Sequence, residues 1–129
     1  MTAFLSDAWL AALHDAARSY GPLPALDGEP PLILATEVHL DDGETVSYQV
    51  RFGRDGIAVE PAPTGPADLT IVADYATAAA LARGETNGQR ALTAGALLLR
   101  GDIDRIARTR EVLVALADCF ATVRAETEY

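Results

Sequence analysis

ADLTIVADYATAAALARGETNGQRALTAGALLLRGDIDRI, residues 67–106, decides the fold, because a strand, two helices and a second strand follow one another in it with clear boundaries. Asp74 stands between the apolar strand and an alanine-rich segment. Its carboxylate is therefore expected to accept from the free N–H groups of the next helical turn, where the helix dipole also favours an anion. Gly84 is expected to end this helix, since glycine adopts the left-handed conformation at little steric cost.

The second half of the stretch predicts another helix and a strand. Thr86 or Asn87 is expected to begin the helix, and Gly95 permits a sharp turn into the strand. Leu97 and Leu99 share one face of that strand because side chains alternate along it. About twenty residues of helix connect the two strands, so we expect these strands to be parallel and joined by a right-handed crossover.

The residues before this stretch predict a helix followed by an antiparallel meander. Ser6 is expected to cap a helix that runs to about Tyr20, and strands are expected at 32–40, 45–52 and 57–60. The apolar side of the helix carries Leu5, Trp9, Leu13, Ala16 and Tyr20. Alternation along the first two strands gives each one apolar face, formed by Leu32, Leu34, Thr36, Val38 and Leu40 and by Val46, Tyr48, Val50 and Phe52.

A last helix is expected after Asp102, which would cap it. Its apolar residues form two neighbouring stripes, together wider than a helix on a single layer requires. The first stripe is Ile103, Ile106, Leu113, Ala117 and Phe120, and the second is Val112, Leu116, Cys119 and Val123. The helix is then either a well-covered core helix, or one stripe lines a ligand cavity or a subunit contact.

Composition limits the classes of function. The 129 residues predict one domain over 1–129, and 19 acidic residues against ten arginines give a net charge of -9. Such a charge repels phosphate backbones, so we expect no nucleic-acid partner. Cys119 is the only cysteine, which fits a buried side chain in a reducing compartment. The N-terminus lacks the basic and apolar regions of a signal peptide, and no apolar run approaches the ~20 residues of a membrane span. We therefore expect a cytoplasmic location without stable membrane insertion.

The chain shows no pattern typical of catalysis, so we expect no enzyme, no cofactor and no metal site. No serine lies in a nucleophile elbow, and the glycines form no phosphate-binding loop. His14 and His39 lie on the polar sides of their elements, where we expect solvated surface residues. The acidic residues at 41–44 lack the spacing of a calcium loop and predict the turn of a hairpin.

The stretch from Asp68 to Asp102 resembles the C-terminal half of a sterol carrier protein type 2 domain, and the order of elements resembles that family along nearly the whole chain. The resemblance implies an α+β fold: a five-stranded mixed sheet, made of an N-terminal antiparallel meander and a helical crossover. Helices would cover one face, with an apolar cavity between the layers. It also places Val46, Leu69 and Ile71 inward. The ligand-binding residues that it implies are Val38, Tyr48, Val50, Phe52, Leu81, Leu92, Leu97, Leu99, Leu113 and Phe120.

The function implied is a non-catalytic carrier that encloses a fatty acyl, sterol-like or other apolar small molecule. Two alternatives stay open: an accessory or dimerising subunit of an enzyme with apolar substrates, and a small enzyme that uses an acid such as Asp55 or Asp102. Leu98 on the outer face of its strand, together with the second stripe of the last helix, suggests a homodimer. In the competing interpretation the protein is monomeric, because the residues after Leu116 fold back over Leu98.

Overall fold

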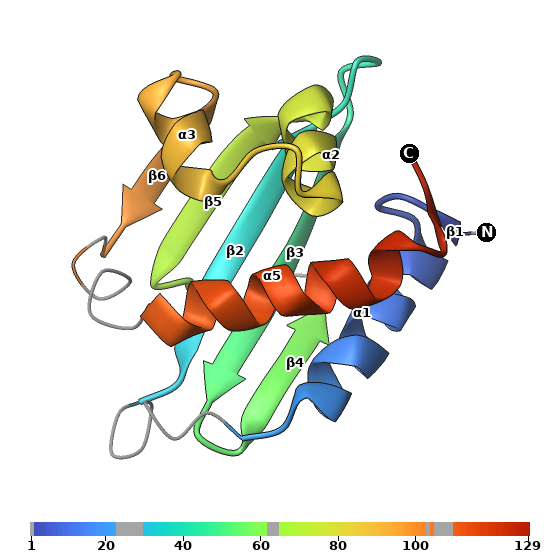
Figure 1. The fold of residues 1–129 in the computed structure, drawn as a ribbon. Helices are drawn as coiled ribbons and strands as arrows, with labels where there is room; N and C mark the ends of the chain where they lie inside the picture. Colours follow the sequence, from blue (N-terminus) through green and yellow to red (C-terminus); the bar gives the residue numbers. More distant parts are fainter. Residues whose placement is uncertain (1, 23–29, 62–64, 103, 105–109) are drawn as a thin grey trace.

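In the computed structural model, a twisted sheet carries the described helices on one of its faces (Figure 1). The structure describes residues 2–22, 30–61, 65–102, 104 and 110–129, without the side chains of residues 88, 89, 110, 111 and 113. Its elements are β1 (Thr2–Ala3), α1 (Asp7–Tyr20), β2 (Leu32–His39), β3 (Thr45–Gly53), β4 (Gly56–Glu60), β5 (Leu69–Asp74), α2 (Tyr75–Arg83), α3 (Gly88–Thr93), β6 (Leu97–Gly101), α5 (Arg110–Arg124) and β7 (Thr127–Glu128).

The main sheet has five strands in the order β4-β3-β2-β5-β6. Strands β2, β3 and β4 form an antiparallel meander, and β5 joins β2 in parallel. The meander turns as expected: Glu44 donates its backbone N–H to Asp42 at 2.9 Å, and Gly43 has a φ of 88°. The expected α+β fold with a mixed five-stranded sheet is thereby confirmed.

The direction of β6 corrects one expectation. Strand β6 pairs antiparallel with β5, so that Ala73 lies opposite Leu97 and Ile71 opposite Leu99. Helices α2 and α3 have only nine and six residues, and both lie at the end of the sheet where β5 stops (Figure 1). A parallel strand would need a connection that travels back along the sheet. Because α2 reverses into α3, the chain re-enters the sheet at the end where it left.

The expected helix boundaries in this connection are confirmed. Asp74 and Asn87 each accept from the backbone N–H three residues on, at 2.8 Å and 2.9 Å. Gly84 and Gly95 have φ values of 78° and 76°, in the left-handed region that glycine tolerates. Ser6 caps α1 in the same way, since its hydroxyl accepts from the N–H of Trp9 at 3.1 Å.

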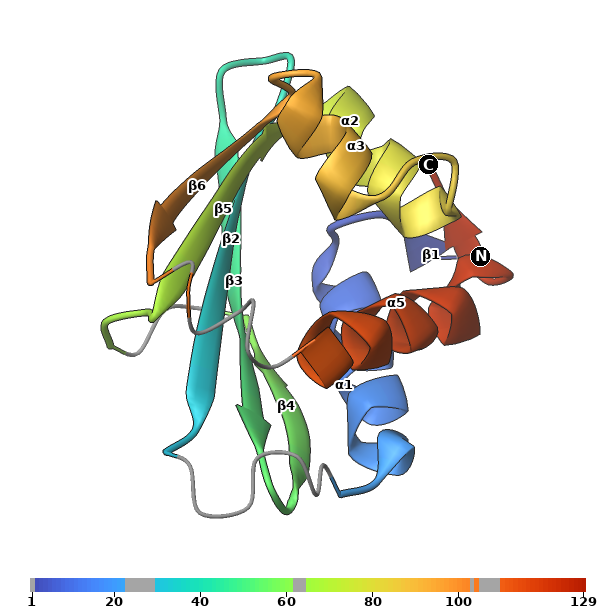
Figure 2. The ribbon, with the colours of Figure 1, turned by 60° about the vertical axis from the view of Figure 1, so that its left-hand side comes forward.

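The helical layer is held together from both ends of the chain. Helix α1 packs against β4, and α5 packs on α1 and α2, so the helices lie on one side of the sheet (Figure 2). The short strands β1 and β7 pair in parallel and join the two termini. The residues after Leu116 therefore run to the N-terminus instead of folding over Leu98, which is 62% exposed. That part of the monomer interpretation is wrong.

Helix α5 buries the second of its two expected stripes. Val112, Cys119 and Val123 are buried within the chain, whereas Ala117 of the first stripe is exposed. These three side chains are therefore covered within the chain and are not free for the subunit contact that was one expectation, whereas Leu116 of the same stripe is half-buried. The predicted start of the helix, including most of residues 103–109, lies outside the described residues.

Candidate ligand site

The inner face of the sheet is covered unevenly. Seven inward side chains of β2, β3 and β4 are buried: Leu32, Leu34, Val38, Val50, Phe52, Ile57 and Val59. Ile71 and Leu99 face the same way by register but stay half-buried, although Leu69 and Leu97 beside them are buried. An inward side chain keeps solvent access only where the helices do not close over it. The middle of β5 and β6 is therefore an accessible part of the interior, and Val46 near the start of β3 is half-buried as well.

One cross-strand row links this accessible part to the closed core. The register places Tyr48 opposite Thr36, Thr36 opposite Ile71, and Ile71 opposite Leu99. Tyr48 is 4% exposed, whereas the other three side chains are half-buried. Three strand spacings of ~4.8 Å give the row a length of roughly 14 Å, comparable to an extended chain of about a dozen carbons. Its shape suits an elongated apolar molecule.

The helices also carry apolar side chains that are half-buried. Leu81 of α2 and Leu116 and Phe120 of α5 pack against the buried core without being closed off. Leu92 of α3, which we expected to face inward, is 46% exposed. The side chain of Leu113 lies outside the described residues. These half-buried side chains come from α2 and α5.

The closed end of the row carries polar groups in apolar surroundings. Burial raises the pKa of Tyr48 to about 12, and a hydrogen bond with Thr36 lowers it only in part, so the phenol stays protonated at neutral pH. Trp9 of α1 is fully buried. Its ring centroid lies 6.0 Å from that of Tyr48 and 6.1 Å from that of Phe120. The sequence pattern assigned Trp9 to the core and gave no sign that it borders this region.

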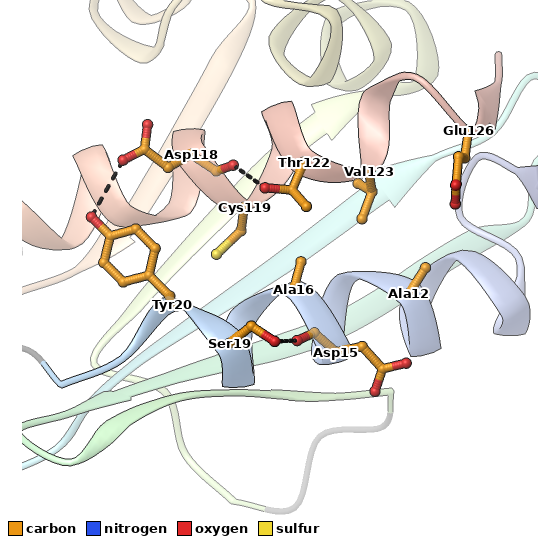
Figure 3. Close-up of a pocket in the computed structure, with 10 residues that line it drawn as sticks. All are labelled: Ala12, Asp15, Ala16, Ser19, Tyr20, Asp118, Cys119, Thr122, Val123 and Glu126. Atoms are coloured by element: carbon orange, nitrogen blue, oxygen red, sulfur yellow. Dashed lines mark hydrogen bonds between the residues drawn. The ribbon is translucent and has the colours of Figure 1, made fainter.

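Two hollows lie on the outside of the molecule, away from the predicted site residues. A groove between α1 and α5 has a floor of small side chains and acidic rims, and Tyr20 donates across it to Asp118 at 3.3 Å (Figure 3). A second hollow beside the β3–β4 turn includes His14. His14 is not the solvated residue that we expected, because it is partly buried and accepts from the N–H of Val59 at 3.0 Å.

The described residues place no catalytic group or metal cluster in the interior. They contain no group of three His, Cys, Asp or Glu side chains able to hold a metal ion. Asp55 and His39 are exposed, and the thiol of Cys119 is buried. Burial, and secondly the charge of Asp118, raises the pKa of that thiol, so it is a poor nucleophile. None of the described helices is long and apolar enough to span a membrane.

Comparison with known proteins agrees with this architecture. A crystal structure of sterol carrier protein 2 is 20% identical, with a TM-score of 0.67 over 94% of this chain and 97% of that one. A conserved hypothetical protein from Thermus thermophilus is 22% identical, with a TM-score of 0.69 over 93% and 89%. Apo sterol carrier protein 2 from Yarrowia lipolytica is 18% identical, with a TM-score of 0.63 over 85% and 88%. Because the sequence identities are this low, the likeness to these structures shows the fold alone.

No curated protein matches the chain. The model of one protein family matches residues 34–114, which is more than half of the sequence. The match includes β3, β4, β5 and β6 and all but the first two residues of β2. With the fold and this match in agreement, the chain belongs to the SCP-2 sterol transfer family.

Proposed function

We propose that this chain is a non-catalytic carrier that binds an acyl-chain or sterol-like molecule between the sheet and its helical cover. The observation that carries the proposal is the continuous row of half-buried inward side chains at Thr36, Ile71 and Leu99, whereas most inward side chains of the meander are buried. Membership of a sterol transfer family supports it.

The ligand-binding residues that we predicted divide into two groups on this proposal. Val38, Tyr48, Val50 and Phe52 form the closed wall, because all are buried on the inner face. Leu81, Leu97, Leu99 and Phe120 border the accessible part, and Leu113 belongs to the same helix as Phe120. We assign Leu92 to the rim of the proposed site because it is exposed.

The energetics of such a site need apolar area and few polar contacts. Burying about a dozen methylenes contributes roughly 10 kcal/mol at ~0.8 kcal/mol each. Lost translational and conformational freedom removes part of this gain. A net value near -8 kcal/mol corresponds to a dissociation constant of about 1 μM.

A pair of neighbouring substitutions tests the site. Leu99→Trp adds bulk inside the proposed site, whereas Leu98→Trp adds the same bulk on the outer, exposed face of the same strand. We expect Leu99→Trp to weaken binding of a fluorescent fatty acid probe by about tenfold, which is ~1.4 kcal/mol. Leu98→Trp should leave the affinity unchanged. Equal affinities in both folded variants would show that the ligand does not bind at β6. In a separate experiment, native mass spectrometry of the protein from its source should show retained lipid.

An accessory or dimerising role is the second candidate, favoured by Leu98. This leucine is 62% exposed on the outer face of β6, which is an edge strand of the sheet. Exposed hydrocarbon at an edge is often covered by a second copy. Sedimentation at micromolar concentration tests this role: a dimer that Leu98→Arg dissociates supports it, and a wild-type monomer excludes self-association as its basis.

A further inference from the structure

The indole N–H of Trp9 is buried without a hydrogen-bond partner among the described residues. Trp9 has no solvent-exposed surface, so water does not satisfy this donor from outside. Buried donors are almost always paired, because leaving one unpaired loses the full hydration of the group. An orphaned donor at the border of a proposed ligand site points to an acceptor on the ligand.

The place of Trp9 supports this interpretation. Its ring stacks on Phe120 with an interplanar angle of 21° and meets Tyr48 nearly edge-on at 74°. Phe120 is half-buried against the core, and Tyr48 begins the row that leads to Leu99. Trp9 thus lies beside Tyr48 at the closed end of the row, whose two ends, Tyr48 and Leu99, are about 14 Å apart by strand spacing.

The same end of the row can hold a neutral oxygen, but the described inward side chains of the sheet offer no cation to an ionised group there. By register, the inward side chains of the main sheet include no Arg, His, Asp or Glu among the described residues. The phenol of Tyr48 is protonated and bonded to Thr36. An ionised carboxylate moved there would lose its hydration without gaining a cation, which costs far more than moving an alcohol or a carbonyl.

We propose that Trp9 donates its indole N–H to an uncharged oxygen of the ligand, and that the site therefore selects neutral oxygenated lipids, such as long-chain or sterol-like alcohols and esters, over ionised fatty acids. This proposal rests on the proposed carrier function. It adds a residue that determines specificity, and it fixes which end of the ligand lies deep: the polar group is at Trp9 and the hydrocarbon extends toward Leu99.

The test uses the fact that the chain has one tryptophan, and hence one indole N–H signal in a ¹H–¹⁵N NMR spectrum. The probes are 1-dodecanol, dodecane and dodecanoate, each delivered from cyclodextrin at pH 8. We expect 1-dodecanol to move the indole proton downfield and dodecane to leave it in place, while both shift the methyl signals of Ile71 and Leu99. Dodecanol should bind at least about fivefold more tightly than dodecanoate.

Two variants check the origin of the effect. Trp9→Phe keeps an aromatic ring but removes the donor, and it should weaken dodecanol about threefold to tenfold, the range of one neutral hydrogen bond, without changing the affinity for dodecane. Tyr20→Phe removes a hydroxyl on the outside of α1 and should change neither affinity. If Trp9→Phe does not fold, the indole shift in the wild type still decides the matter.

The possible failures are distinguishable. If dodecanol shifts the methyl signals of Ile71 and Leu99 but leaves the indole signal in place, the proposal for Trp9 is wrong. The indole N–H would then point at an aromatic face, such as that of Phe4, whose ring centroid is 4.8 Å from that of Trp9. A preference for dodecanoate overturns the claimed selectivity. If none of the probes moves the methyl signals, the carrier function itself fails, and the proposal for Trp9 falls with it.

Discussion

Replacing Asp74 by alanine is expected to loosen the helix that roofs the proposed site. The Asp74 carboxylate accepts from the backbone N–H of Thr77 at 2.8 Å at the start of α2, and this nine-residue helix carries Leu81. Loss of such a cap costs about 1 kcal/mol. For a chain of this size that lowers the melting temperature by about 4 °C. Gly84 at the other end of the helix is unaffected, so the native fold should persist.

The pH dependence separates the charge of Asp74 from its capping bond. Hydrogen bonds from the side chain and then the backbone of Thr77 lower the pKa of Asp74 below its ordinary value of 3.8. A carboxyl with a lowered folded-state pKa adds stability above its unfolded value, and this stability is lost as the pH falls through the folded value. Asp74→Asn keeps an acceptor for Thr77 and should be only slightly destabilised at pH 7. The stability that wild type holds over Asp74→Asn should shrink below about pH 4.

Thermal unfolding followed by circular dichroism at pH 7 and pH 3 measures these differences. Asp55→Ala is the matched control, because Asp55 is highly exposed and pairs only loosely with Arg54 at 3.5 Å. Such a surface pair contributes little to stability. An Asp74→Ala variant as stable as wild type at pH 7, or no more affected than Asp55→Ala, refutes the capping argument.

Two further outcomes follow from the backbone and the core. Gly101→Ala should destabilise the fold by at least ~2 kcal/mol in urea unfolding, because Gly101 has a φ of 115° and a Cβ there would collide with the Asp68 carbonyl. Gly43→Ala, at a φ of 88° in open space, should cost only the backbone strain of about 1 kcal/mol, and equal losses would contradict the collision. The Cys119 thiol should react with a disulfide reagent only as fast as the protein opens, since it is buried and its pKa is raised. Cys119 lines the groove between α1 and α5, so rapid modification of the folded protein would show that a reagent enters this groove as far as the thiol.

The sequence by itself determined the local elements and the inner face of the sheet. Caps at Ser6, Asp74 and Asn87 and left-handed glycines at Gly84 and Gly95 depend on hydrogen bonds within a few residues, so their chemistry is legible in the chain. The inward set of β2 and β3 follows from alternation, which a strand cannot change without turning every side chain to the other face.

Only the tertiary structure decided how these elements meet. The direction of β6 depends on which end of the sheet the chain reaches after α2 and α3. These two short helices return the chain to the end where β5 stops, and no local signal encodes this return. His14 lies on the polar face of α1 in the sequence pattern. In the structure α1 packs against β4, and His14 accepts a hydrogen bond from the N–H of Val59. Whether an apolar side chain is closed core or an accessible wall, as with Val50 and Leu99, depends on which helix covers it, because periodicity specifies the face of a side chain and not what packs over it.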